Sequence, residues 1–132
     1  MSKSANPGSG VIITGGASGI GLASAEALAE VGRPVAIWDI NAERSVAVAA
    51  DLADRFGVAT VGVGVDLSAM ANIAPALEQT RAALPSIGGL VHAAGISLAV
   101  PVEEMTEAQW DAVLNVNLKA LPFMVQQLRS LL

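Results

Sequence analysis

A glycine-rich loop directly after a short apolar run constrains this chain more than any other feature. Residues 11–14 read VIIT and residues 15–21 read GGASGIG, so four glycines fall within seven positions. The β-branched run predicts a strand covered on both faces, and the good helix formers after the loop predict a helix. Glycines in such a loop let backbone N–H groups approach a pyrophosphate, which the helix N-terminus also favours. A P-loop is excluded because no Lys-Ser/Thr pair follows the glycines.

The composition narrows the class of protein. With 132 residues and 53% hydrophobic content, the chain is long enough for one domain with a real core. The net charge of −5 and the lack of a basic cluster argue against nucleic acid as a partner. The absence of cysteine and the single histidine argue against a metal site. We find neither a signal peptide nor an apolar stretch of membrane-spanning length, and therefore expect a cytoplasmic protein.

Strand and helix patterns alternate along the chain, which is typical of a parallel sheet covered by helices. We expect residues 1–10 to be a flexible lead-in and residues 11–132 to form one dinucleotide-binding domain. Asn41 and Ser68 are expected to cap helices, Thr106 and Gln109 to form a capping box, and the glycines at 62 and 64 to place their strand near an edge. The predicted strands are 11–14, 34–38, 58–65 and 89–93, and the predicted helices are 20–31, 42–56, 69–84 and a last one running to about 131.

An acidic residue closes the second predicted strand. Asp39 follows Gly21 by eighteen residues, near the place where a carboxylate can take both hydroxyls of an adenosine ribose. The same carboxylate would repel a 2′-phosphate, and no arginine stands beside Ser18 or Asp39 in the sequence. We therefore predict NAD rather than NADP as the cofactor. The alternative interpretation of Asp39 is a solvated turn residue.

These motifs together resemble the N-terminal half of the short-chain dehydrogenase/reductase family. Residues 14–21, TGGASGIG, match the family's TGxxxGxG loop, and residues 92–95, HAAG, stand where the family has Asn-Asn-Ala-Gly. The resemblance implies a Rossmann-like α/β fold with a parallel sheet in the order 3-2-1-4, whose cofactor crevice lies where strands 1 and 4 meet. It also implies that Asn117 belongs to the catalytic set. The residues it implies for cofactor binding are Gly15, Ser18, Gly19, Ile20, Gly21, Asp39, Ile40, Asp66, Leu67, Ala93, Ala94 and Gly95.

One of these positions departs from the family's pattern, and three allow more than one interpretation. Ala93 replaces an asparagine that ties the central strand to its neighbours in many members of the family. His92 is either an acid/base group or a neutral ring at a strand end, and we prefer the second because no partner is evident. Asp66 is either a helix-entry residue or an adenine contact, and we prefer the contact because Ser68 fills the cap. Asn117 is either an exposed helix residue or a member of the catalytic set, and its apolar neighbours favour the second.

The family's tyrosine, lysine and serine have no counterpart in this sequence, which contains no tyrosine. In the family they follow the segment matched here, so the chain is expected to be truncated before the YxxxK element and inactive alone. The prediction is the cofactor-binding half of an NAD(H)-dependent oxidoreductase that transfers hydride between nicotinamide and an alcohol or ketone, with Asn117 holding a water of the proton relay. The alternative is a non-catalytic dinucleotide-binding or interaction module. The last helix is apolar nearly all round, which predicts a homo-oligomer formed through it.

Overall fold

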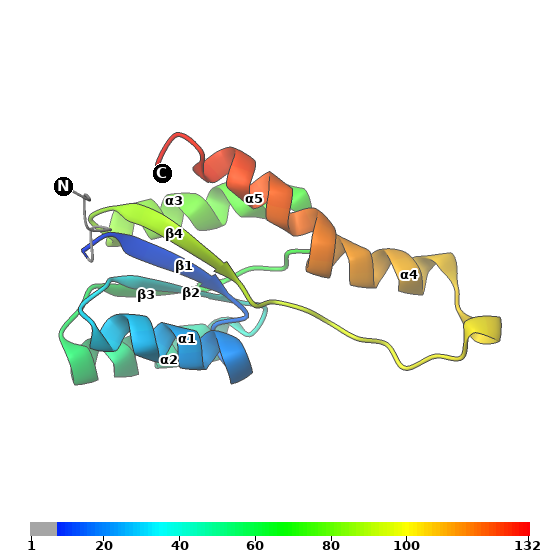
Figure 1. Cartoon of the computed structure of the whole chain (residues 1–132), viewed down its shortest axis with the longest axis horizontal. Coiled ribbons are helices and arrows are strands. Elements are labelled where there is room, and N and C mark those ends of the chain that lie inside the picture. The colour runs from blue at the N-terminus through cyan, green and yellow to red at the C-terminus, as the bar shows by residue number, and fades with distance from the viewer. Residues whose placement is uncertain (1–7) are drawn as a thin grey trace, which may run out of the picture.

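A parallel sheet of four strands organises the part of the chain that this computed structural model describes, residues 8–132 (Figure 1). The strands are β1 (Gly10–Thr14), β2 (Val35–Asp39), β3 (Thr60–Gly64) and β4 (Ile87–His92). Their order is β3-β2-β1-β4, and every neighbouring pair is parallel. The predicted fold class and strand order are therefore confirmed.

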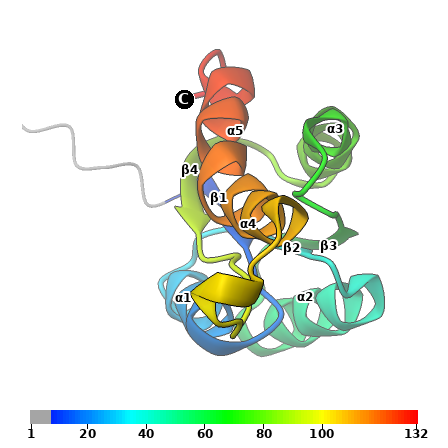
Figure 2. The same cartoon turned by 90° about the vertical axis from the view of Figure 1, so that its right-hand side faces the viewer.

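Helices cover both faces of this sheet. Figure 2 shows α1 (Gly19–Glu30) and α2 (Ala42–Phe56) on one face, and α3 (Ile73–Ala83) and α5 (Ala120–Leu128) on the other. The side chains of β1 alternate between the two resulting cores, with Ile13 facing α1 and α2 and Ile12 facing α3 and α5. Inside the second core the indole Nε1 of buried Trp38 donates to Thr80 Oγ1 at 2.9 Å, so the one polar atom of that large ring is satisfied.

The helix α2 begins and ends as its sequence predicts. The Asn41 side chain accepts the N–H of Arg44 at 3.0 Å, and Gly57 takes the left-handed conformation at the other end with φ +67°. The edge position of β3 is also as expected. Its glycine at 62 has a packing reason, because a Cβ there would lie 2.3 Å from the backbone of Ser45 in α2.

The predicted cap at Ser68 is wrong. A short 3₁₀ segment, Met70–Asn72, precedes α3, and no side chain caps either of them. The Ser68 N–H instead donates to the Asp66 carboxylate at 2.9 Å, a local turn that competes with the helix. With the later start, Pro75 falls in the first turn of α3, where its missing N–H costs little.

The last predicted helix is interrupted. The capping box of Thr106 and Gln109 is present and starts α4 (Glu107–Leu114), but a π-helical segment, Asn115–Lys119, separates α4 from α5. Residues 96–119, which we call the arm, project beyond the sheet and include no buried residue (Figure 1). Among the described residues, no helix is both long and apolar enough to cross a membrane.

The structure describes the last three residues of the predicted lead-in, residues 8–10. Residues 1–7 of the predicted flexible lead-in are outside the described residues. At its end, Gly10 is the first residue of β1, and the Arg33 guanidinium donates to both the carbonyl and the hydroxyl of Ser9 at 2.8 Å. The last two residues of the lead-in are thus held against the sheet.

Candidate functional site

A cavity of about 370 Å³ among the described residues, which we call the main cavity, opens at the carboxyl ends of the strands. It lies between β1 and β4, after which the chain continues to opposite faces of the sheet. This is the topological switch point at which open α/β sheets bind ligands. All twelve residues predicted for cofactor binding line it. The sequence did not single out four further lining residues, Trp38, Val65, Ile96 and Val116, which are apolar and so carry no chemical signature.

Two glycines of the loop are required by space or by backbone conformation. A Cβ on Gly21 would lie 2.1 Å from the carbonyl oxygen of Gly15, so only glycine lets α1 begin this close to the loop. Gly15 itself has φ +64°, and a Cβ on it would lie 2.8 Å from the backbone nitrogen of Ala94. The loop therefore presents bare backbone to the cavity, which is what close approach to a phosphate needs.

The Asp39 side chain accepts two backbone hydrogen bonds and also lines the main cavity. Its Oδ2 accepts the Ala17 N–H and its Oδ1 accepts the Asn41 N–H, each at 3.1 Å. The carboxylate thus fixes the glycine loop to the start of α2. Each oxygen keeps further acceptor capacity, so the same side chain is able to accept hydroxyl groups from a ligand in the cavity.

In the fold, an arginine contacts the glycine loop. Arg44 Nε, from the first turn of α2, donates to the carbonyl oxygen of Ala17 at 2.5 Å. The expectation that no arginine stands beside Ser18 holds for the sequence, but in the fold the guanidinium contacts the residue before it. Arg44 reaches the loop because α2 begins directly after Asn41 and places its first turn beside Ala17.

Asp66 follows β3 and also lines the cavity. The Ser68 hydroxyl and the Ser68 N–H, which donates to Oδ1 at 2.9 Å, hold the pKa of the Asp66 carboxyl below its ordinary value. The reason given for a free carboxylate, a cap at Ser68, is therefore wrong. Asp66 instead holds a turn and keeps its ionised form, while Leu67 beside it is buried.

A buried threonine at the end of β1 connects this strand to the end of β4. Thr14 Oγ1 accepts the Ala94 N–H at 3.1 Å and lies 2.8 Å from His92 Nδ1. The Ala93 N–H donates to the Thr14 carbonyl at 3.2 Å, which supplies a tie at the position where the family has asparagine. His92 does not line the cavity, and its enclosed Nε2 has no hydrogen-bond partner among the described residues. His92 is the last residue of β4, as the second interpretation of this residue expects.

Asn117 has the polar partner that its apolar surroundings required. Its Oδ1 accepts the Ile96 N–H at 2.8 Å and its Nδ2 donates to the Ile96 carbonyl at 2.9 Å. It lies in the π segment, a helix distortion frequent at functional sites. Asn117 does not line the main cavity. Its hydrogen bonds hold the backbone of Ile96, and Ile96 lines that cavity.

A second hollow, of about 380 Å³, adjoins the first. It lies between the loop after β4 and α4, and shares Ile96 with the main cavity. Its lining is uncharged and mostly apolar, and includes Asn117, Leu98, Met105 and Trp110. Among the described residues, no three His, Asp or Glu side chains gather as a metal site would require.

The fold and the cavity define an α/β protein of the Rossmann-like class. The family model described as short chain dehydrogenase matches residues 9–132. The chain therefore belongs to the short-chain dehydrogenase family, as its motifs predicted.

The relatives align with most of this chain, but each of them is about twice as long. It is 40% identical over 117 residues to a probable galactose dehydrogenase of Rhizobium meliloti, covering 89% of this chain and 46% of that protein. The structure of L-sorbose reductase from Gluconobacter frateurii, complexed with NADPH and L-sorbose, aligns with a TM-score of 0.84 and 27% identity over 90% of this chain and 45% of that one. The 3-ketoacyl-(acyl-carrier-protein) reductase of Brucella melitensis, complexed with NADH, aligns with a TM-score of 0.85 and 26% identity over 94% and 50%. The chain thus spans about half the length of the relatives it matches.

Proposed function

We propose that this chain is the cofactor-binding half of an NAD(H)-dependent oxidoreductase that acts on a small alcohol or carbonyl compound, in the cytoplasm. The observation that carries the proposal is the main cavity, in which bare glycine backbone stands at one side and the Asp39 carboxylate at another. The donor set fits a dinucleotide, because backbone N–H groups suit a pyrophosphate and a carboxylate suits two vicinal ribose hydroxyls. The relatives bind either NADPH or NADH, so the preference for NAD rests on Asp39 alone.

Each part of the cavity has a task in this proposal. The glycine loop and the N-terminus of α1 hold the pyrophosphate, Asp39 holds the adenosine ribose, and Asp66 with Leu67 borders the adenine. Bound nicotinamide would accept or donate the hydride. Asn117 positions Ile96 and the arm at that end, and its amide keeps one N–H and one acceptor site for a water of a proton relay. The adjoining apolar hollow is our candidate for the wall of the substrate pocket.

Calorimetric titration of the chain with NAD tests this function directly. We expect binding, and we expect Asp39→Asn to weaken it at least tenfold, because one charge-assisted acceptor for the ribose is lost. Glu43→Gln removes the same charge from the exposed first turn of α2 and serves as the control. If wild-type chain binds neither NAD nor NADP, the proposal is wrong.

A non-catalytic dinucleotide-binding module is the second candidate. The residues given contain no tyrosine, and the family's proton transfer needs one, so this candidate holds if none follows them. The two candidates differ in turnover once the reading frame is followed downstream. A YxxxK element and a serine there support the enzyme, and their absence supports the module. Reduction of a ketone with NADH by the 132-residue chain itself would exclude the module.

We also propose that the chain associates through its last helix. Leu121, Phe123 and Val125 of α5 are 37%, 41% and 44% exposed, a high exposure for large apolar side chains on one short helix. Sedimentation velocity tests this, and a well-behaved monomer would contradict it.

A further inference from the structure

A buried threonine hydroxyl lies between the single histidine of the sequence and the wall of the main cavity. Thr14 Oγ1 is 2.8 Å from His92 Nδ1 and accepts the N–H of Ala94 at 3.1 Å. Ala94 lines the main cavity, and its backbone nitrogen is the atom that a Cβ on Gly15 would meet at 2.8 Å. The hydroxyl therefore holds a part of the cavity wall that packs directly against the glycine loop.

The Thr14 hydroxyl and His92 Nδ1 can share a proton in either of two directions. A neutral imidazole has one N–H and one bare nitrogen. If Nδ1 donated to Oγ1, the O–H of the fully buried Thr14 would have no acceptor among the described residues, and a bare Nε2 would have no donor. If the Thr14 O–H donates to Nδ1, only the Nε2–H is left unpaired. The second direction is therefore favoured, because each unpaired buried group is costly.

This direction requires a neutral ring. With the ring proton on Nε2, the Thr14 oxygen uses its hydrogen toward Nδ1 and a lone pair toward the Ala94 N–H. A second proton on the ring would occupy Nδ1 and reverse the bond. The Thr14 O–H would then lack an acceptor in a side chain with no exposed surface. The contact that holds Ala94 therefore competes with protonation of His92.

The ring has no charged partner in the part of the chain that the structure describes. No ion pair there includes His92, and Thr14 is the one hydrogen-bond partner of its nitrogens. The strand β1 and the helix α5, which share cores with β4, contain no charged side chain. The charged side chains on the other elements around β4 are all at least partly exposed, and they are Glu26 and Glu30 of α1, Glu78 and Arg81 of α3, and Lys119 of the π segment.

We propose that His92 is a positioning residue for the dinucleotide, whose neutral ring orients the Thr14 hydroxyl so that the hydroxyl oxygen holds Ala94 and the cavity wall beside the glycine loop. This inference rests on the proposed dinucleotide function and adds to it a dependence of binding on the protonation of one side chain. His92 does not line the main cavity, so it acts through Thr14 and Ala94. Acid therefore loosens this wall and weakens binding.

The nitrogen NMR spectrum of the imidazole tests the direction of the hydrogen bond without any ligand. Because the sequence has a single histidine, the two nitrogens of His92 are the only imidazole signals of the chain. We expect the proton on Nε2 and a bare Nδ1 at neutral pH. A proton on Nδ1 at neutral pH would refute the inference.

Calorimetric titration with NAD between about pH 5 and 8 tests the consequence for binding, because histidine changes charge in this range and the sequence has no cysteine. We expect wild-type binding to be about fivefold weaker at the acid end, the effect of one hydrogen bond. His92→Asn keeps an acceptor at the branch position of Nδ1 and does not titrate, so its affinity should not change with pH. Thr14→Val keeps the shape without the hydroxyl and should bind about fivefold more weakly than wild type at the alkaline end, with no pH dependence.

The results separate this inference from the proposed function. Equal pH dependence of wild type and His92→Asn would refute the inference, and so would wild-type affinity in Thr14→Val, while in both cases the dinucleotide function stands. A chain that binds neither NAD nor NADP at any pH overturns the proposed function and this role of His92 together. Thermal unfolding checks that each variant is folded where binding is measured. If Thr14→Val unfolds, the comparison of wild type with His92→Asn still decides.

Discussion

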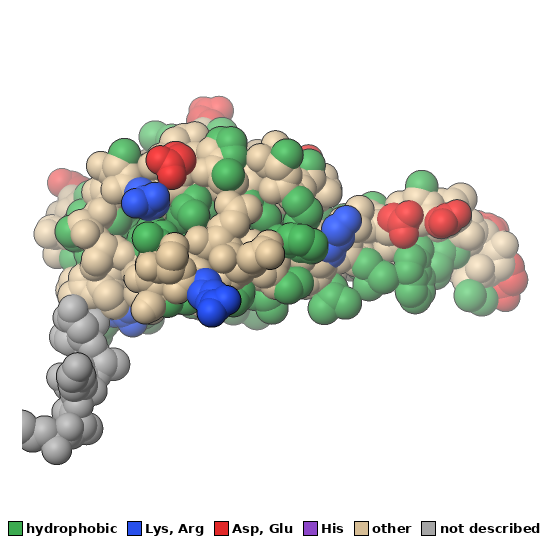
Figure 3. Space-filling view, turned by 90° about the horizontal axis from the view of Figure 1, so that it is seen from above, with side chains coloured by type: hydrophobic (Ala, Val, Ile, Leu, Met, Phe, Trp, Pro, Cys, Tyr) green, Lys and Arg blue, Asp and Glu red, His purple; other side chains and the backbone are tan. Residues whose placement is uncertain are grey.

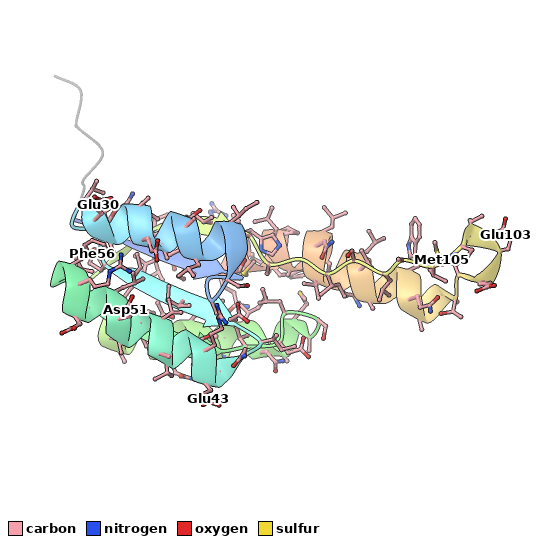
Figure 4. All side chains as sticks on the ribbon, turned by 90° about the horizontal axis from the view of Figure 1, so that it is seen from below. Glu30, Glu43, Asp51, Phe56, Glu103 and Met105 are labelled. Atoms are coloured by element: carbon pink, nitrogen blue, oxygen red, sulfur yellow. The ribbon has the colours of Figure 1, made fainter. Side chains whose placement is uncertain are left out.

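The two halves of the candidate site are built differently. On the side of α1 and α2, the glycine loop connects the fully buried strand β1 to α1, and the two helices cover this face of the sheet. Figure 4 shows these helices side by side, with Glu43 at the end of α2 nearer the arm, and Glu103 and Met105 at the far end of the arm. On the arm side, β4 has one neighbour, only Ile87 of it is buried, and no residue of the arm is.

The surface of the arm is also divided. Figure 3 shows apolar side chains along one side of it and acidic ones along the other. Residues 96–119 contain four acidic residues, at positions 103, 104, 107 and 111, and a single lysine at 119. Local hydrogen bonds such as the capping box and the Asn117 contacts hold this region, whereas apolar burial holds the other. The side of α1 and α2, which we call the cofactor side, therefore has its own apolar core, whereas the arm has none.

The largest expected effect compares one substitution in the two regions. Leu52→Ala in α2 should lower the free energy of unfolding by about 3 to 4 kcal/mol, because this side chain is fully buried and leaves a cavity. Leu98→Ala in the arm, where the side chain is 48% exposed, should change it by less than about 1 kcal/mol. Urea unfolding of both variants measures the difference. Equal losses would mean that the arm is packed as tightly as the sheet.

Within the cofactor side, the glycine loop should be the most sensitive backbone. Gly21→Ala forces a Cβ against the Gly15 carbonyl and should cost about 2 to 3 kcal/mol, together with nucleotide binding. Gly57→Ala is the control, since its φ is also unusual at +67° but nothing lies within 4 Å of a Cβ there. That control should cost about 1 kcal/mol and leave binding intact. The role given to the loop would be contradicted if Gly21→Ala still bound NAD with wild-type affinity.

On the arm side, Asn117→Ala removes both hydrogen bonds to Ile96. We expect a loss of about 1 kcal/mol, appearing as faster amide hydrogen exchange in residues 93–101 with the sheet unaffected. Asn115→Ala in the same π segment has no such bond and is the matched control. Exchange that stays slow in the Asn117 variant would show that the loop is held by other contacts.

The smallest effect concerns Asp66 and the pH. The Ser68 contacts lower the pKa of Asp66 in the folded state, so the stability they contribute is present at neutral pH and is lost as the pH falls through the acid range below about 4. Asp66→Asn should therefore be less stable than wild type at pH 7, by well under about 1 kcal/mol because the group is exposed, and the gap should narrow as the pH falls. Asp54→Asn, on the exposed side of α2, gives the background. A gap that widens in acid would reverse the assigned sign.

Local sequence patterns predicted the cofactor side well because the structure of each motif there depends on only a few neighbouring residues. The VIIT run, the glycine spacing and the cap at Asn41 each determine structure within a few residues, so their placement followed from the sequence. The same was true of the capping box at Thr106. The twelve predicted residues come together in one cavity because parallel strands deliver their carboxyl ends to one edge of the sheet.

The misses arose where distant segments or competing local bonds decide. Ser68 caps no helix, and both its hydroxyl and its N–H are bonded to the Asp66 carboxylate instead. The π segment adds one residue to a helical turn around Asn117, which no hydrophobic period reveals. The Arg44–Ala17 contact joins residues 27 apart in sequence, with α1 and β2 between them, so no local pattern predicts it.

The indole of Trp38, sealed in the sheet and bonded to Thr80, gives this protein an unusually simple emission spectrum. With no tyrosine and only two tryptophans, the fluorescence of the chain has one sheltered source and one, Trp110, that is 55% exposed on the arm. The blue-shifted part of the emission should come from Trp38 in the sheet. The red-shifted part, which a quencher can reach, should come from Trp110 on the arm. A single acrylamide titration can thus observe both regions separately, without any added label.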